Sequence, residues 1–289
     1  MNLDRLARVR RHNPGAIDRA WAARRRRPLL APDGRMLVVA ADHMARGALG
    51  VRDDPVAMAS RPDLLRRLAV ALSRPGVDGV LGTADVLEDL LLAGLLDDKL
   101  VFGSMNRGGL QGASFELDDR ATAYTADQIA ARGLDGGKML VRICLDDPGT
   151  VTTLSECARS VDQLAAHRLP AMIEPFWSIR EAGRVINLLD AESVIRSVNV
   201  VSGLGSTSAY TWLKLPVVPD MERVLAATTL PVLMLGGDPR EDPEATYAVW
   251  AAALAQPTAA GLVVGRALLY PPDGDVGAAV DIAASLVHG

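Results

Sequence analysis

The chain has 289 residues, which fits one large domain or two ordinary ones, and 49% of them are hydrophobic while only 4% are aromatic. A core of this size must be built from alanine, valine, leucine and isoleucine, which favours alternating strands and helices over an all-β sandwich. The net charge of −4, with both signs interspersed, gives no general attraction to nucleic acid or to anionic membranes.

The first 35 residues are the one strongly basic part of the chain. Ten of the 31 basic residues lie there, including the run from Arg24 to Arg27. Such a run is usually the solvated end of a helix, and we adopt that interpretation; a basic arm that binds another molecule is the alternative. We predict that residues 1–35 form a helical extension that covers the bottom or the side of the domain that follows.

Eight short apolar segments follow, each of strand length and bounded by turn residues. The first, residues 36–42, is a continuous apolar run that ends on a charge at Asp42, as expected of a strand covered on both faces. The other seven strands are predicted at residues 79–82, 100–104, 138–143, 170–174, 211–215, 231–235 and 261–265.

Segments with apolar residues at helical spacing separate the strands, as crossovers between parallel strands require. The clearest of these predicted helices are residues 64–72, 86–96, 121–131 and 151–166. Eight alternations of strand and helix over about 250 residues are typical of a closed barrel rather than an open doubly wound sheet. We therefore predict an α/β fold, a (β/α)8 TIM barrel over residues 36–289, with the helical extension 1–35 before it.

Cysteine and histidine are scarce, which limits the cofactors that the chain can hold. Cys144 and Cys157 are too few for a disulfide framework and lack metal-site spacing, so we expect a reduced, cytoplasmic setting. Only His43 of the four histidines falls at a strand end, which disfavours zinc; Mg²⁺ between Asp42 and Glu174 is the alternative. We find no signal peptide, membrane span or nucleotide-binding glycine motif, and expect no metal and no cofactor.

Functional groups of a TIM barrel come from the carboxyl ends of its strands and from the loops that follow them. Few polar residues occupy those ends in this chain. They are Asp42, His43, Asn106, Arg107, Lys138, Arg142, Glu174, Lys214, Asp238 and Arg266.

Lys214 is the most informative of them, because a long cation interrupts an apolar strand. Its plain interpretation is a lysine that reaches solvent or pairs with Glu174. However, each layer of side chains inside a TIM barrel comes from every second strand. Lys138 in the fourth predicted strand and Lys214 in the sixth can therefore converge. A neighbouring ammonium and an apolar wall both lower the pKa of a lysine and leave a neutral, nucleophilic amine, as imine chemistry requires.

A second constellation consists of Leu235-Gly-Gly-Asp238 and Gly265-Arg266, after the last two predicted strands. These loops are the usual phosphate site of the fold, where glycines let backbone N–H groups approach an anion and Arg266 can supply charge. The alternative is that the glycines only turn the chain at the strand ends.

In this order, the motifs resemble those of the class I aldolase superfamily, which includes deoxyribose-phosphate aldolase, archaeal-type fructose-bisphosphate aldolase and tagatose-1,6-bisphosphate aldolase. The resemblance covers residues 36–285 and extends to an aldolase-like group associated with the catabolism of inositol and related sugars. It is carried by Ala41-Asp-His43, Lys138-Met-Leu-Val-Arg-Ile-Cys-Leu-Asp-Asp-Pro148, Ile173-Glu-Pro175, Trp212-Leu-Lys-Leu-Pro216, Pro231-Val-Leu-Met-Leu-Gly-Gly-Asp-Pro239 and Gly261-Leu-Val-Val-Gly-Arg266. One departure is that Arg142 and Cys144 stand where related enzymes place tyrosines or other groups of this strand.

The resemblance implies a lyase that cleaves or forms a carbon–carbon bond in a phosphorylated sugar through a Schiff base on Lys214. Glu174 then takes the proton from a substrate hydroxyl, with Asp42 as the second candidate, and Lys138 lowers the pKa of Lys214. The predicted substrate- and phosphate-binding residues are Gly236, Gly237, Gly265, Arg266 and Arg142.

We expect the partner to be a small sugar phosphate, with no nucleic acid and no membrane, and the protein to be a homo-oligomer. Two alternatives stay open. One is a phosphosugar isomerase or epimerase in which Glu174 moves protons without a covalent intermediate, and the other is a non-enzymatic binding module that uses the basic N-terminal segment.

Overall fold

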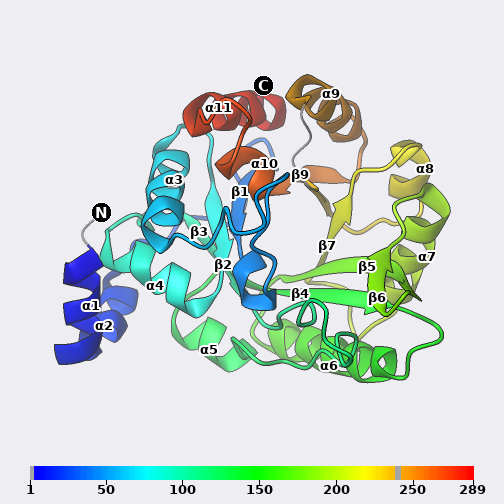
Figure 1. Ribbon diagram of the computed structural model, residues 1–289, viewed down its shortest axis with the longest axis horizontal. Helices are drawn as coiled ribbons and strands as arrows, with labels where there is room; N and C mark the ends of the chain where they lie inside the picture. The colour runs from blue at the N-terminus through cyan, green and yellow to red at the C-terminus, as the bar shows by residue number, and fades with distance from the viewer. Residues whose placement is uncertain (1–2, 238–241) are drawn as a thin grey trace.

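Eight parallel strands close into a barrel with helices around it, as the ribbon shows (Figure 1). The structure is a computed structural model, and it describes residues 3–237 and 242–289. The strands follow one another around the ring, and the pairing of β4 with β5 completes it, so the predicted (β/α)8 TIM barrel is confirmed. The ring consists of β1 Met36–Ala41, β2 Gly79–Gly82, β3 Leu100–Ser104, β4 Gly136–Ile143, β5 Ala171–Glu181, β7 Thr211–Pro216, β8 Val232–Leu235 and β9 Ala259–Val264.

The helices of the barrel differ from prediction mainly at their ends. They are η1 His43–Arg46, α3 Arg61–Ser73, α4 Ala84–Leu92, α5 Ala126–Ala131, α6 Gly149–Ala166, α7 Ala191–Ser202, α8 Met221–Leu225, α9 Pro243–Leu254, α10 Arg266–Leu269 and α11 Val276–His288. The predicted helix 121–131 begins five residues late, because the Thr125 hydroxyl accepts the N–H of Gln128 and caps the helix there. The predicted helix 86–96 stops at Leu92, and Gly94 follows with φ of +73°.

One strand was not predicted. β5 runs on to Glu181, beyond the predicted end at Glu174, and turns back through Gly183 into the antiparallel strand β6, Arg184–Asn187. Charged and polar residues are frequent in this hairpin, so its sequence lacks the apolar run that marks the other strands. The hairpin projects past the carboxyl end of the barrel wall.

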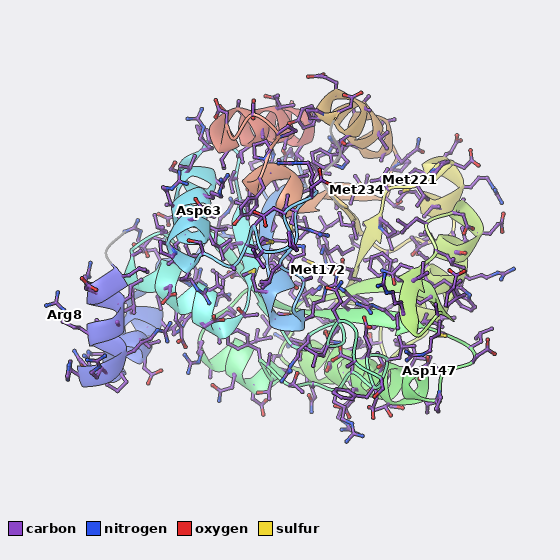
Figure 2. All side chains as sticks on the ribbon, viewed as in Figure 1. Arg8, Asp63, Asp147, Met172, Met221 and Met234 are labelled. Carbon is purple, nitrogen blue, oxygen red and sulfur yellow. The ribbon has the colours of Figure 1, made fainter. Side chains whose placement is uncertain are left out.

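The barrel interior is filled by apolar side chains up to the level of the strand ends. Side chains alternate along a strand, so those of every second residue enter the barrel. Met172 is fully buried there, and Figure 2 shows it near the middle of the molecule. The same alternation then brings Glu174 into the barrel above Met172, and Asp42 above Ala40. The interior cluster comprises Met36, Val38, Ala40, Leu81, Leu100, Phe102, Met172, Leu233 and Val263.

The N-terminal segment forms two helices outside the barrel, α1 Leu3–His12 and α2 Gly15–Ala23, and α2 packs against α4 (Figure 1). Arg8 projects from the outer face of α1 (Figure 2). The interpretation of the run from Arg24 to Arg27 as a solvated helix end is wrong for Arg24, which is only 8% exposed. The run follows the end of α2, with Arg24 in extended conformation, and the Arg24 guanidinium donates to the Gly133 and Lys99 carbonyls and pairs with Asp135.

Within residues 3–237 and 242–289, every helix is too short or too polar to cross a membrane.

Candidate active site

A cavity of about 400 Å³ opens at the carboxyl ends of the strands. The 400 Å³ lies within the range of about 300–1,000 Å³ that is usual for small-molecule sites. The structure brings most of the predicted residues to its wall. These are Asp42, His43, Arg107, Lys138, Glu174, Lys214, Gly236, Gly237, Gly265 and Arg266.

The floor of the cavity holds a cluster of four charged side chains. The Lys138 ammonium lies 2.9 Å from a carboxylate oxygen of Asp42 and 2.6 Å from one of Glu174. The Lys214 ammonium lies 3.0 Å from the same Glu174 oxygen. All four residues are buried, so the predicted convergence of the two lysines is found, and Lys214 pairs with Glu174 instead of reaching solvent.

The pKa values of the two lysines of this cluster are shifted in opposite directions. Burial lowers the pKa of Lys214 and the nearby Lys138 ammonium lowers it further, although Glu174 opposes both. Burial also acts to lower the pKa of Lys138, but Asp42 and Glu174 on either side outweigh it and raise that pKa. Lys138 is therefore a lasting cation, while Lys214 is the amine that gives up its proton more readily.

Both carboxylates of the cluster are held in the charged form. Burial alone raises a carboxyl pKa, but the two lysines outweigh it and lower the pKa of Glu174 to about 2. The pKa of Asp42 lies well below its usual range for the same reason, with His43 adding to the effect. The ammonium of Lys138 occupies the space between the two carboxylates where the alternative hypothesis places Mg²⁺. In the described residues, no three His, Cys, Asp or Glu side chains are grouped to bind a metal.

The predicted phosphate-binding residues lie together on the β8 and β9 side of the cavity. A side chain on Gly265 would begin 2.6 Å from the Ala40 carbonyl oxygen, so the close approach of this turn to β1 requires glycine. Gly237 has φ of +65°, which also favours glycine, and one Arg266 nitrogen lies 3.4 Å from the Gly50 carbonyl oxygen. These glycines therefore do allow the chain to turn at the strand ends. Asp238 lies outside the described residues.

The structure does not bring Arg142 into the cavity. Its guanidinium forms a buried ion pair with Glu116, on the loop after β3, and its side chain does not line the wall. Asn106 is also directed elsewhere, because its side-chain amide bonds to both backbone groups of Leu140. These two residues hold the loop against β4. Their positions at strand ends made both residues candidates for the site. Their actual partners lie too far away in the sequence to be predicted.

Several residues of the cavity were missed. Arg46 comes from η1, Asn187 and Leu189 come from the unpredicted hairpin and the turn after it, and Trp250 belongs to α9. Above the charged floor, an apolar collar consists of Leu140, Phe176 and Leu235.

A compositional signal for the lysines was available. Only three of the 31 basic residues are lysine, and two of these three meet on Glu174. Almost every other positive charge in the chain is carried by arginine, whose guanidinium cannot act as an amine nucleophile. The two lysines therefore point to chemistry that arginine cannot perform.

Comparison with protein families matches residues 34–284 to the family described as Cgl0159-like. The chain belongs to the Cgl0159-like family. Its structure is similar to that of Cgl0159 from Corynebacterium glutamicum, with 55% identity, a TM-score of 0.97, and coverage of 99% of this chain and 96% of the other. Comparison with curated proteins gave no match.

More distant similarity reaches aldolases. A Schiff base-forming fructose-1,6-bisphosphate aldolase aligns with a TM-score of 0.67 at 19% identity, over 94% of this chain and 100% of the other. A fructose-bisphosphate aldolase from Slackia heliotrinireducens aligns with a TM-score of 0.62 at 12% identity, over 87% and 86%. At such identities the likeness shows a shared fold. The predicted resemblance to this superfamily is therefore confirmed for the architecture.

Proposed function

We propose that the protein is a class I aldolase that cleaves or forms a carbon–carbon bond in a phosphorylated ketose through a Schiff base on Lys214. The observation that carries the proposal is a buried amine of lowered pKa at the floor of a cavity, beside a carboxylate that also contacts the Lys138 ammonium. The fold that the chain shares with Schiff base-forming aldolases adds support.

In the proposed reaction, the neutral Lys214 amine attacks the substrate ketone and forms a carbinolamine. Protonation of its hydroxyl and loss of water give a cationic imine. A base then takes the proton of the hydroxyl on the far carbon, the carbon–carbon bond breaks, and its electrons neutralise the imine to an enamine as an aldehyde leaves. Protonation of the enamine carbon and hydrolysis release the second product and restore the amine.

Glu174 is the group best placed to take the hydroxyl proton, since it touches Lys214. With a pKa of about 2 it is a weak base in the resting protein. Its pKa is low because two cations face it, and one of them disappears as the imine becomes a neutral enamine. The proton affinity of Glu174 therefore rises during the step that needs it. Asp42 is the second candidate for this role.

The same observation weighs against the phosphosugar isomerase or epimerase. Such an enzyme needs a carboxylate basic enough to remove a proton from carbon without help from an imine, and the two lysines that face Glu174 keep its pKa low and make it a weak base. The binding-module alternative is weakened as well. Asp135 and Asp78 pair with Arg24, Arg26 and Arg27, and this leaves little charge for a ligand.

Borohydride trapping tests the proposal directly. Incubation with dihydroxyacetone phosphate and borohydride should attach a reduced adduct to Lys214, located by peptide mass spectrometry. Lys214→Met should lose the adduct, whereas the control Lys99→Met, at the opposite end of the barrel, should keep it. With three lysines in the chain the assignment is unambiguous. The absence of any adduct with a panel of ketoses, or an adduct on Lys99, would refute the proposal.

A further inference from the structure

The wall of the cavity is chemically divided. Towards β9, β1 and the loop after β3 it is charged, because Arg46, Arg107 and Arg266 line it there. The opposite side is formed by β4, β5, β7, the end of β8 and α9. Of the residues that the structure describes, those that line this side above the charged floor are apolar, except Asn187 and Thr246. The proposed reaction uses the floor and the charged side, and the apolar side has no part in it.

The apolar side begins directly above the reacting groups. Every second side chain of a strand enters the barrel, so the residue two places after a floor residue is the next one towards the mouth. On β5, Phe176 therefore stands above Glu174. On β7, Pro216 stands above Lys214, and Leu235 of β8 lies opposite Pro216 in the strand register. A carbon chain that leads from the reacting groups towards the mouth along these strands meets only apolar side chains.

Polar residues further along these strands are engaged elsewhere. On β4, Arg142 follows Leu140 on the same side of the strand, but its guanidinium pairs with Glu116 and does not line the cavity. On β5, Ser178 is buried and donates its hydroxyl to the side-chain oxygen of Asn187. This side of the cavity therefore offers few hydrogen-bond partners to a substrate hydroxyl, and a hydroxyl that is buried without a partner weakens binding.

At the mouth, the apolar side continues into large side chains that are open to solvent. Leu189, after β6, is 57% exposed and Val249, on α9, is 42% exposed, and both line the cavity. Val217, after β7, also lines it and is half-buried. An apolar ligand that covers these side chains removes their surface from water, which favours its binding. The apolar collar and these three residues together suit a hydrocarbon chain.

We infer that the substrate fragment released as the aldehyde is an alkyl aldehyde, whose chain carries no hydroxyl group and packs on the apolar side of the cavity. The inference rests on the proposed function, and it names the substrate class: a ketose phosphate whose end beyond the cleaved bond is an alkyl chain. Glu174 takes the proton of the hydroxyl that becomes the aldehyde oxygen, so the chain on the same carbon leads past Phe176 to the mouth. The phosphate-bearing end then lies towards the glycine loops after β8 and β9.

Matched aldehydes test the inference in the direction of bond formation. The donor is the ketone that gives the borohydride adduct, beginning with dihydroxyacetone phosphate. Butanal and 3-hydroxypropanal differ only in a terminal methyl group against a hydroxyl group of similar size. The kcat/KM, expressed per concentration of free aldehyde, should be about 10- to 100-fold higher for butanal, the range found for hydrophobic pockets. Equal values, or a higher value for 3-hydroxypropanal, would overturn the inference.

Variants decide whether the collar is responsible for this preference. Leu140→Asn and Phe176→Gln each place an amide in the collar, and each should reduce the ratio of the two kcat/KM values about tenfold. Leu145→Asn is the matched control, because the same change then falls on a side chain that is 75% exposed and outside the cavity, and it should keep the ratio. The ratio compares two substrates on one sample, so a partly unfolded variant does not alter it. A ratio that both amide variants leave unchanged would contradict the placement of the chain.

A binding measurement separates failure of this inference from failure of the aldolase. Reduction of the ketone in the two addition products gives two alcohols that cannot form an imine. In calorimetric titrations, the alcohol with the alkyl end should bind about 10-fold or more tightly than the one with the terminal hydroxyl. If trapping fails and this difference holds, the aldolase is refuted and the apolar binding site stands. If trapping succeeds and the two alcohols bind equally, the inference is wrong and the aldolase stands.

Discussion

At the amino-terminal end of the barrel, Asp78 and Asp135 each accept the backbone N–H of a neighbouring strand, at 2.7 Å from Leu37 and at 2.8 Å from Val101. Their remaining charge meets arginine. Arg27 lies 2.5 Å from Asp78, and Arg24 and Arg26 both reach Asp135.

At the carboxyl end, the carboxylates of Asp42 and Glu174 meet lysine instead and face a cavity. Both ends bury ionised side chains, but Asp78 and Asp135 are bonded to the strand backbone and paired with arginine, a cation that cannot lose its proton, whereas Asp42 and Glu174 are paired with lysine. Burial of charge is therefore not itself a sign of function. The combination of lysine, a shifted pKa and open space beside it is what distinguishes the site.

The largest expected effect is the loss of the nucleophile. Lys214→Met should abolish cleavage, since the other lysine of the cavity floor, Lys138, is kept charged by Asp42 and Glu174, while the protein keeps a cooperative thermal melt. Steady-state assay and calorimetric unfolding on the same sample separate the two outcomes. Turnover near that of the unaltered protein would remove Lys214 from the mechanism.

At the other end of the barrel, Asp135→Ala should lower stability without affecting chemistry. It removes the acceptor for Val101 and leaves the buried Arg24 guanidinium without its carboxylate. Breaking one partner of a buried pair costs about 3–5 kcal/mol, which denaturant unfolding would measure. The control Asp98→Asn, which removes the charge of the exposed partner of Arg25 and suits the left-handed backbone at this position, should change stability little. A folded Asp135→Ala protein with reduced turnover would show that the two ends are coupled.

Features that leave a local pattern in the sequence could be predicted, and features that depend on distant partners could not. Strands buried on both faces leave continuous apolar runs, so all eight barrel strands were found, and side-chain alternation then placed Lys138, Glu174 and Lys214 together. The position of Arg142 at a strand end was no guide to its direction, because Glu116 on a distant loop determines it. The roles of Arg24 and Arg27 depend in the same way on Asp135 and Asp78, which no local pattern connects to them.

The hairpin of β5 and β6 and the cavity face of α9 show the same limit. Their residues line the cavity only because the chain returns over the barrel mouth, and periodicity within a segment carries no information about such a return.

For the predicted phosphate loops, Arg266→Ala should raise the KM for a phosphorylated ketose about 10- to 100-fold, the equivalent of about 1.5–3 kcal/mol for a charged hydrogen bond. The KM for the unphosphorylated analogue should change much less. Steady-state kinetics on the matched pair measure the difference. If both substrates lose equally, Arg266 supports the fold of the β9 turn and does not bind phosphate.

The smallest expected effect concerns Lys138, and it is visible only as a function of pH. The Lys138 ammonium is one of the causes that lower the pKa of Lys214, so Lys138→Met should raise that pKa. Imine formation needs the neutral amine, and its rate falls as pH drops below the Lys214 pKa. The acidic limb of the profile should therefore move to higher pH in the variant, with about a tenfold slower reaction on that limb for each unit by which the pKa rises.

Raising the pH should restore imine formation in Lys138→Met, because a protonated amine is inactive but not lost. The readout is the initial rate of borohydride-trapped adduct with dihydroxyacetone phosphate, since complete turnover also includes any contact of Lys138 with substrate. Lys99→Met is the matched control and should keep the original limb, because Lys99 donates to the Val77 carbonyl at the amino-terminal end of the barrel. Identical acidic limbs in the unaltered protein and Lys138→Met would mean that the two lysines are not electrostatically coupled. Lys138 would then resemble the arginines of the opposite end, a cation whose role is to neutralise Asp42 and Glu174.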